Sequence, residues 1–244
     1  MADILFKEAL FTQAIDQYKI VLEAGQSEFR EDTLAKLSQI YLQKEELTAA
    51  IPLLEQLENE AYVKENILFA ESNLMKAYTK TEEYKASITY AEKILAKNKL
   101  DEDLRLDAKK TIARSSFITK DLETAETYYS EVEKEAKGAL KAEALYYSAY
   151  FKNANKAYEA STKVVQELIA NYSAYKYWGV KSYVIMAKNY YSVEDAYQAT
   201  FILENVIKNF SQFEDIVKDA QIELDTIKAN EAKTNNSVTP QNKN

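Results

Sequence analysis

The sequence predicts an all-α solenoid of antiparallel helix pairs, and two observations carry this prediction. Only 3 Gly and 2 Pro occur among 244 residues, so long stretches lack the residues that turns and sheets require. A small residue also recurs at an almost constant interval, each time within the same pattern of apolar residues. A short helical unit that repeats in this way buries its apolar face against its neighbours, which produces a stacked array.

The recurring small residue marks one amphipathic helix in each repeat. Six positions carry it: Ala14, Ala50, Ser87, Ala125, Ser161 and Ala199. Their spacings are 36, 37, 38, 36 and 38 residues. Apolar residues stand three positions before and four and seven positions after it, as Leu47, Leu54 and Leu57 do around Ala50. These offsets lie on one face of a helix, so each stretch is predicted to pack through its small residue.

A different helix is predicted to precede each of these helices. A tyrosine stands nine residues before the small residue in three repeats, at Tyr41, Tyr78 and Tyr190, and the stretch Leu34-x-x-Leu37-Ser38-x-x-Tyr41 shows its periodicity. The two patterns together resemble those of the tetratricopeptide-repeat (TPR) family, whose first helix reads large-x-x-large-small-x-x-Tyr. The resemblance covers about residues 1–210. It implies a right-handed superhelix in which small residues sit where paired helices cross.

The sequence departs from the family pattern in a few places. The fourth repeat has Ser116 where tyrosine is expected, and the proline that commonly ends a TPR is missing. The fifth repeat is expected to be about one residue short in its internal turn, judging from Tyr146-Tyr147-x-x-Tyr150-Phe151. Pro52 falls in a second helix, where a proline is tolerated in the first turn. These departures affect the expected helix ends more than the fold.

The predicted boundaries give five full repeats, a partial repeat at the start and a capping helix, all in one solenoid over residues 1–232. The repeats lie near 1–24, 30–58, 66–97, 104–136, 140–171 and 178–209. Residues 214–232 are expected to form an amphipathic helix whose polar outer face caps the array. Residues 233–244 are rich in Asn and Gln and are expected to be a disordered tail.

Composition argues against most kinds of chemistry. The net charge of −8 disfavours general nucleic-acid binding, and no apolar run is long enough to insert into a membrane. The chain has no Cys and no His, so thiolate chemistry, histidine acid–base catalysis and the usual zinc ligands are missing. Ser87 and Ser161 hold the small packing position and are expected to be core residues rather than nucleophiles. We therefore predict a protein that is not an enzyme and has no metal or cofactor.

The family resemblance implies that the first helices line a concave groove where ligands bind. Carried onto this sequence, it predicts a partner-binding groove formed by Gln39, Lys76, Lys80, Lys110, Arg114, Phe117, Tyr146, Tyr150, Lys188 and Tyr191. The cations among these residues, together with Lys181, would form a basic stripe that suits an acidic peptide or protein. The alternative is ordinary solvated charge on the helix faces.

A group of aromatic residues precedes the last repeat's first helix. Tyr175, Tyr177 and Trp178 are expected in a long connection, where they form a candidate interface because such side chains bury area yet keep a polar group. The alternative is packing between repeats.

These observations predict a non-catalytic scaffold that binds a peptide or protein partner. The stretch Lys141-Ala-Glu-Ala-Leu-Tyr-Tyr also resembles TPR proteins of the bacterial cell envelope, which favours a periplasmic location over the cytoplasm. The alternative function is a structural or oligomerisation segment of a longer TPR array. In that case exposed apolar residues of the partial repeat, such as Leu5, Phe6 and Leu10, would mediate self-association.

Overall fold

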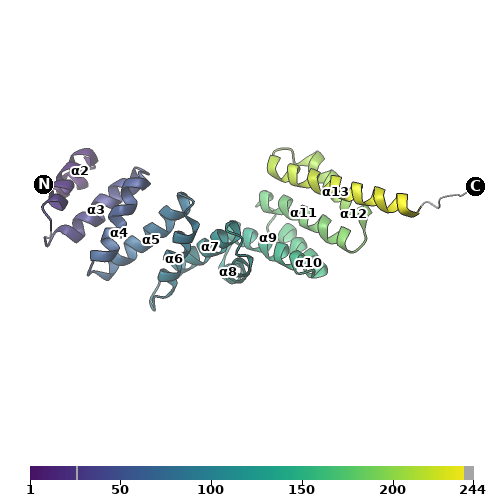
Figure 1. Cartoon of the computed structure of the whole chain (residues 1–244), viewed down its shortest axis with the longest axis horizontal. Coiled ribbons are helices and arrows are strands. Elements are labelled where there is room, and N and C mark those ends of the chain that lie inside the picture. Colours follow the sequence, from purple (N-terminus) through teal and green to yellow (C-terminus); the bar gives the residue numbers. More distant parts are fainter. Residues whose placement is uncertain (26, 239–244) are drawn as a thin grey trace, which may run out of the picture. The chain divides into compact units, whose positions relative to one another are not determined.

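The structure is a computed structural model that describes residues 1–25 and 27–238, and this part of the chain is all-α. Its thirteen helices are α1 (Ala2–Lys7), α2 (Phe11–Glu23), α3 (Arg30–Gln43), α4 (Leu47–Glu60), α5 (Lys64–Lys80), α6 (Tyr84–Leu95), α7 (Glu102–Ile118), α8 (Leu122–Glu135), α9 (Gly138–Ala154), α10 (Tyr158–Asn171), α11 (Lys176–Ser192), α12 (Ala196–Asn209) and α13 (Glu214–Val238). The predicted fold class of successive helix pairs is confirmed (Figure 1).

The helices group into two compact units, Met1–Tyr128 and Tyr129–Asn244. In the first unit α1 packs on α2, α3 on α4 and α5 on α6, and each second helix also packs on the first helix that follows it. The second unit repeats this arrangement with the pairs α9–α10 and α11–α12, and α13 packs on both α11 and α12 (Figure 1). The single array over residues 1–232 stays a prediction.

The recurring small residue is fully buried in every repeat. Ala14, Ala50, Ser87, Ala125, Ser161 and Ala199 each have 0% exposure. The two serines make equivalent hydrogen bonds to the paired first helix, from Ser87 Oγ to the Met75 carbonyl (3.2 Å) and from Ser161 Oγ to the Ala149 carbonyl (2.7 Å). Both hydroxyls are therefore packing groups that tie two helices together, as the sequence predicted.

The turn inside each pair has one backbone geometry throughout the chain. A non-glycine residue with positive φ lies five residues before every small residue, namely Ala9, Glu45, Glu82, Lys120, Lys156 and Glu194, with φ between 57° and 68°. The following N–H donates to a carbonyl five residues back, for example from Glu46 to Tyr41 at 2.9 Å and from Ala157 to Lys152 at 2.8 Å. This pattern ends each first helix with a Schellman motif.

The expectation of a shortened turn in the fifth repeat was wrong. Lys156 stands five residues before Ser161, as in the other repeats, and the carbonyl of Lys152 accepts the bond that the Tyr41 carbonyl accepts in the second repeat. Lys152 thus takes the place of the expected tyrosine. Phe151 and Tyr150 lie one and two residues before it, so the position of an aromatic residue does not locate this turn.

Other helix boundaries also differ from expectation. Pro52 lies in the second turn of α4, beyond the first turn, so the Thr48 carbonyl lacks its usual backbone donor. Helix α13 continues to Val238, because the sequence from Glu214 to Val238 contains no Gly or Pro that would end a helix. The remainder of the expected tail, 239–244, lies outside the described residues.

Replacing Lys156 by glycine is expected to stabilise the protein. Lys156 is exposed and holds φ at 61°, a conformation that strains a residue with a Cβ. Relief of this strain exceeds the entropic cost of glycine in the unfolded chain, so Lys156→Gly should raise the free energy of unfolding by roughly 0.5–1 kcal/mol. Urea unfolding followed by circular dichroism measures the change.

The matched control is Lys163→Gly, also at an exposed lysine but inside α10. A glycine in a helix interior should cost about 1 kcal/mol. Destabilisation by both variants would contradict the assigned turn conformation.

Candidate functional site

The residues predicted to form the groove all lie on first helices. In the first unit, Gln39 lies on α3, Lys76 and Lys80 on α5, and Lys110, Arg114 and Phe117 on α7. In the second unit, Tyr146 and Tyr150 lie on α9, and Lys188 and Tyr191 on α11. The stripe is therefore divided between the two units, and only the residues within one unit can be compared.

The lysines of the first unit face carboxylates of the same unit. Lys110 Nζ lies 2.5 Å from Asp107 Oδ1, and Lys76 Nζ lies 3.9 Å from the other oxygen of that carboxylate. Lys80 Nζ lies 3.3 Å from Glu45 Oε1 in the neighbouring turn. Because Lys76 and Lys80 are more than half exposed, these pairs contribute little stability, but they reduce the positive charge of the stripe.

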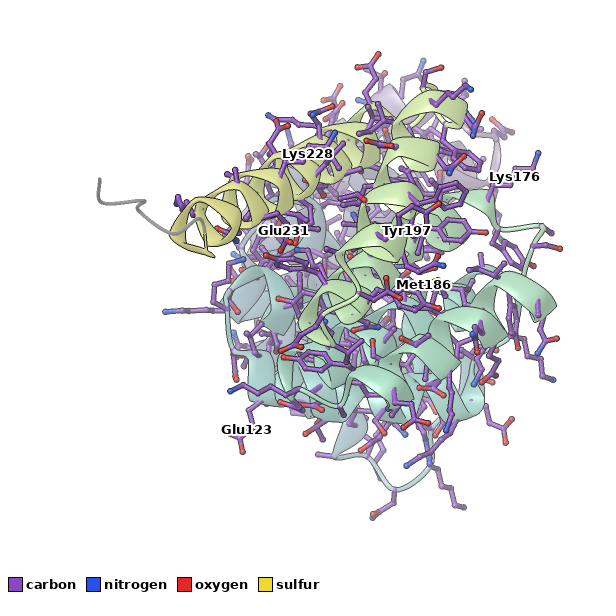
Figure 2. The ribbon with its side chains drawn as sticks, turned by 90° about the vertical axis from the view of Figure 1, so that its right-hand side faces the viewer. Glu123, Lys176, Met186, Tyr197, Lys228 and Glu231 are labelled. Atoms are coloured by element: carbon purple, nitrogen blue, oxygen red, sulfur yellow. The ribbon has the colours of Figure 1, made fainter. Side chains whose placement is uncertain are left out.

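The second unit brings three of the predicted residues together around a cavity of about 280 Å³. Tyr146, Tyr150 and Lys188 line it, together with Lys181 of the predicted basic stripe and Val184, a neighbouring groove position. The other lining residues were not predicted: Asn153, Ile185, Ile216, Asp219, Ile222 and Glu223. We call it the first-helix cavity, since its lining comes from α9, α11 and α13. Figure 2 shows the side chains of the chain, with Met186 on α11 and Lys228 on α13 labelled.

Helix α13 supplies the acidic side of this cavity. Lys181 Nζ lies 3.9 Å from Asp215 Oδ2, and Lys188 Nζ lies 3.3 Å from Glu223 Oε2. The two pairs advance in the same direction along both helices, so α11 and α13 run parallel with opposite charges facing each other. Asp219 lies between the two acidic partners, four residues from each, and also lines the cavity.

Lys181 lies between two tyrosine rings. Its Nζ is 5.6 Å from the ring centre of Tyr146 and 5.2 Å from that of Tyr177, and it donates a hydrogen bond to Tyr177 Oη at 3.1 Å. Burial by itself lowers the pKa of Lys181, but the hydrogen bond to Tyr177 and nearby negative groups including Asp215 outweigh it and raise the pKa. This ammonium is therefore charged at neutral pH and is already engaged within the protein.

Tyr146 forms part of the cavity's buried floor. Its exposure is 9%, and Val184, Ile185 and Ile216 beside it are at 8%, 5% and 0%. Burial is the main cause that raises the pKa of the Tyr146 hydroxyl, and the negative charge of Asp219 adds to the effect. The floor is thus apolar and aromatic, while the charged groups lie around its rim.

A buried series of side-chain hydrogen bonds holds the helices together beneath the cavity. Asn153, which lines the cavity, donates to Asn189 Oδ1 at 2.7 Å. Asn189 is 1% exposed and in turn donates to Ser161 Oγ at 2.9 Å and Thr162 Oγ1 at 3.1 Å. These hydrogen bonds join α9, α10 and α11. The series ends at a second cavity of about 410 Å³ between α10 and α11, and Thr162 and Asn189 line this cavity.

The candidate interface residues Tyr175, Tyr177 and Trp178 are not in a long connection. Tyr175 is the N-cap of α11, and the other two lie in its first turn. All three are partly buried within the second unit: Trp178 contacts the rings of Tyr146 and Tyr147, and Tyr177 donates to Asp215 Oδ2 at 2.8 Å. Packing within the unit accounts for their surroundings, and an interface role stays a prediction.

Two other types of site were sought in residues 1–25 and 27–238. No group of three or more acidic residues there is arranged to hold a metal ion. None of the described helices combines the length and apolar character needed to cross a membrane.

Solved structures share this arrangement of helices. YrrB, described as a TPR protein with an unusual peptide-binding site, matches with a TM-score of 0.61 at 14% identity, covering 86% of this chain and 97% of that one. A TPR protein from Parabacteroides merdae matches with a TM-score of 0.54 at 11% identity, covering 90% and 96%. The chain has the TPR fold. The family resemblance seen in the sequence is thereby confirmed at the level of fold.

A third match extends the comparison to other TPR-like arrays. A structure of nearly identical TPR-like repeats from a putative kinesin light chain of Podospora anserina has a TM-score of 0.51 at 17% identity, covering 74% of this chain and 95% of that one. No protein-family model matches the sequence, and no curated protein matches it significantly. These likenesses establish the fold of the TPR chain and leave its function to be argued from its own residues.

Asn189→Ala is expected to destabilise the second unit. The substitution removes the acceptor of the Asn153 amide and the donor to Ser161 Oγ and Thr162 Oγ1 at a position that is 1% exposed, at a cost of about 1–3 kcal/mol. Thermal and urea unfolding measure the loss. Asn205→Ala is the matched control, because Asn205 is partly exposed on α12 and bonds only to the carbonyl of Phe201 and to Asn209. An equal loss in both variants would contradict a special role for the buried series of hydrogen bonds.

Proposed function

We propose that the TPR chain is a non-catalytic scaffold that binds a segment of a peptide or protein partner in the first-helix cavity. The observation that carries this proposal is the convergence of α9, α11 and α13 on one cavity with a buried aromatic floor and a charged rim. An apolar centre surrounded by polar groups is the usual composition of a protein interaction site.

The dimensions of the cavity favour a side chain of a larger partner over a free small molecule. About 280 Å³ is at the lower limit of small-molecule pockets, whose usual range begins near 300 Å³. Such a volume accommodates one or two anchoring side chains while the rest of the partner lies along the helices. The likeness to YrrB, which is described as having a peptide-binding site, supports the same class of ligand.

The acidic partner that the lysine stripe predicted is the less favoured hypothesis. In both units the lysines of the stripe already face carboxylates of their own chain, as Lys110 faces Asp107 and Lys188 faces Glu223. An acidic partner would have to compete with these groups. The predicted location in the bacterial cell envelope is a separate proposal that fractionation of the source cells would test.

Self-association is the second candidate function, and exposed apolar side chains of the first pair favour it. Ile4, Leu10 and Ile20 are 58%, 42% and 58% exposed. Leu5 and Phe6, expected to be exposed, are instead partly buried, and the Phe6 ring lies 6.5 Å from that of Tyr18. Light scattering over a range of concentrations tests this alternative, and Ile20→Ser should abolish any dimer formed through this surface.

Peptide selection tests the proposed function directly. A random peptide library displayed on phage is panned against the full chain, and the affinities of the selected peptides are measured by fluorescence polarisation. Lys188→Glu should change binding at least tenfold, because it reverses a charge on the rim of the cavity: an acidic partner would bind more weakly and a basic one more tightly. Tyr150→Ala should weaken binding by removing an aromatic wall.

The control is Lys163→Glu, which makes the same charge change at a lysine paired with Glu159 at 3.0 Å on the second cavity. All variants must first show the circular-dichroism spectrum and melting temperature of the unmodified protein. If Lys163→Glu changes binding and Lys188→Glu does not, the partner binds elsewhere. If no peptide is selected, the proposed function fails.

A further inference from the structure

The charges around the first-helix cavity are not evenly matched. Both of its lysines, Lys181 and Lys188, face carboxylates on α13 at 3.9 Å and 3.3 Å. Asp219 lines the same cavity, is exposed, and forms no hydrogen bond or ion pair with the described residues. The lining itself holds two carboxylates, Asp219 and Glu223, against the two lysines, and Asp215 lies just beside it, against Lys181. Because Asp215 and Glu223 each face a lysine, Asp219 is the carboxylate available to a ligand.

The position of Asp219 makes it part of the cavity rather than of the outer surface. It lies between Asp215 and Glu223 on the face of α13 that is directed at α11, and its charge acts on the buried hydroxyl of Tyr146. A cation that reached Asp219 would thus lie in a cavity lined by the rings of Tyr146 and Tyr150, of which Tyr146 already faces the Lys181 ammonium at 5.6 Å. Tyrosine faces attract cations, and the attraction increases when water is excluded.

The rest of the lining indicates what should accompany this cation. Val184 and Ile216 form the buried apolar part of the cavity, and Ile222 at its edge is 56% exposed. An apolar side chain beside the cation would cover Ile222 and remove its apolar surface from water, which is favourable.

We propose that the first-helix cavity binds a basic side chain of the partner segment, arginine in preference to lysine, next to an apolar side chain. This inference rests on the proposed function and names the partner's chemistry. Arginine is preferred because its planar guanidinium can bind a carboxylate with two parallel hydrogen bonds and stack on a tyrosine ring. A carboxylate of the partner would instead have to displace Asp215 or Glu223 from its lysine and lie close to Asp219.

A double-mutant cycle tests the inference. Peptides selected on the full chain should be enriched in arginine beside an apolar residue, and each is compared with its Arg→Gln derivative. Asp219→Asn should weaken binding of the arginine peptide about five- to tenfold, since a hydrogen-bonded charge pair is lost. The Arg→Gln peptide should bind the unmodified protein more weakly than the arginine peptide does, by a similar factor. It should bind the Asp219→Asn variant and the unmodified protein with equal affinity.

The matched control is Asp225→Asn, which makes the same replacement of a carboxylate by an amide at another exposed aspartate of α13. Asp225 accepts a hydrogen bond from Gln221 at 2.9 Å and does not line the cavity, so this variant should bind every peptide as the unmodified protein does. Both substitutions preserve the size of an exposed side chain, and circular dichroism checks that they fold.

The outcomes separate this inference from the function on which it rests. Selection of peptides without basic residues, or equal binding of the arginine peptide by Asp219→Asn and by the unmodified protein, overturns the inference. The proposed function stands in that case if Lys188→Glu or Tyr150→Ala still changes binding. If binding of the selected peptides does not depend on Lys188 or Tyr150, the proposed function fails and the inference falls with it.

Discussion

The close crossing of two helices at a small side chain is the constraint on which this structure depends. Each of the six small residues has no exposed surface, and in two repeats the small residue is a serine whose hydroxyl bonds to the paired helix. A larger side chain at such a point would push the backbones apart, because protein interiors are packed without spare volume. The turn before each small residue is equally fixed, because the residue five positions before it always adopts the left-handed backbone conformation. Together these two features set the geometry of every pair.

Fixed pairs place residues that are distant in sequence side by side. Tyr146, Lys188 and Glu223 come from three successive first helices and line one cavity because those helices lie next to one another. The buried series of hydrogen bonds from Asn153 through Asn189 to Ser161 and Thr162 keeps α9, α10 and α11 in register beneath it. A binding surface built in this way is held by helices rather than loops, so little conformational entropy is lost when a partner binds.

The sequence predicted the fold well because the repeat pattern is local and redundant. A position such as Ala50 or Ala125 is recognised from its own helix, and six copies in register correct one another. The fifth repeat was misaligned where Lys152 replaces the tyrosine, because side-chain identity was used to locate a turn that the backbone defines at Lys156. The extent of α13 was underestimated because a polar helix end and a polar tail have similar composition.

The candidate site was harder to predict because it depends on contacts between repeats. The resemblance identified Tyr146, Tyr150 and Lys188 as groove residues, yet the acidic residues opposite them were assigned to a solvated cap. The spacing of Asp215, Asp219 and Glu223 could have indicated otherwise, since residues four apart share a helix face and match the lysines at 181 and 188. Only the packing of α13 on α11 shows that these charges meet, and this changes the expected sign of the partner.

Photo-cross-linking would test the central claim most directly, namely that a partner segment binds in the first-helix cavity. A selected peptide carrying benzoylphenylalanine in place of its apolar residue is irradiated with the full chain, and the attachment sites are mapped by mass spectrometry. The account predicts cross-links within 146–153, 181–188 and 216–223, the segments that line the cavity. Cross-links concentrated at 158–166, beside the second cavity, or spread over the first unit would contradict it.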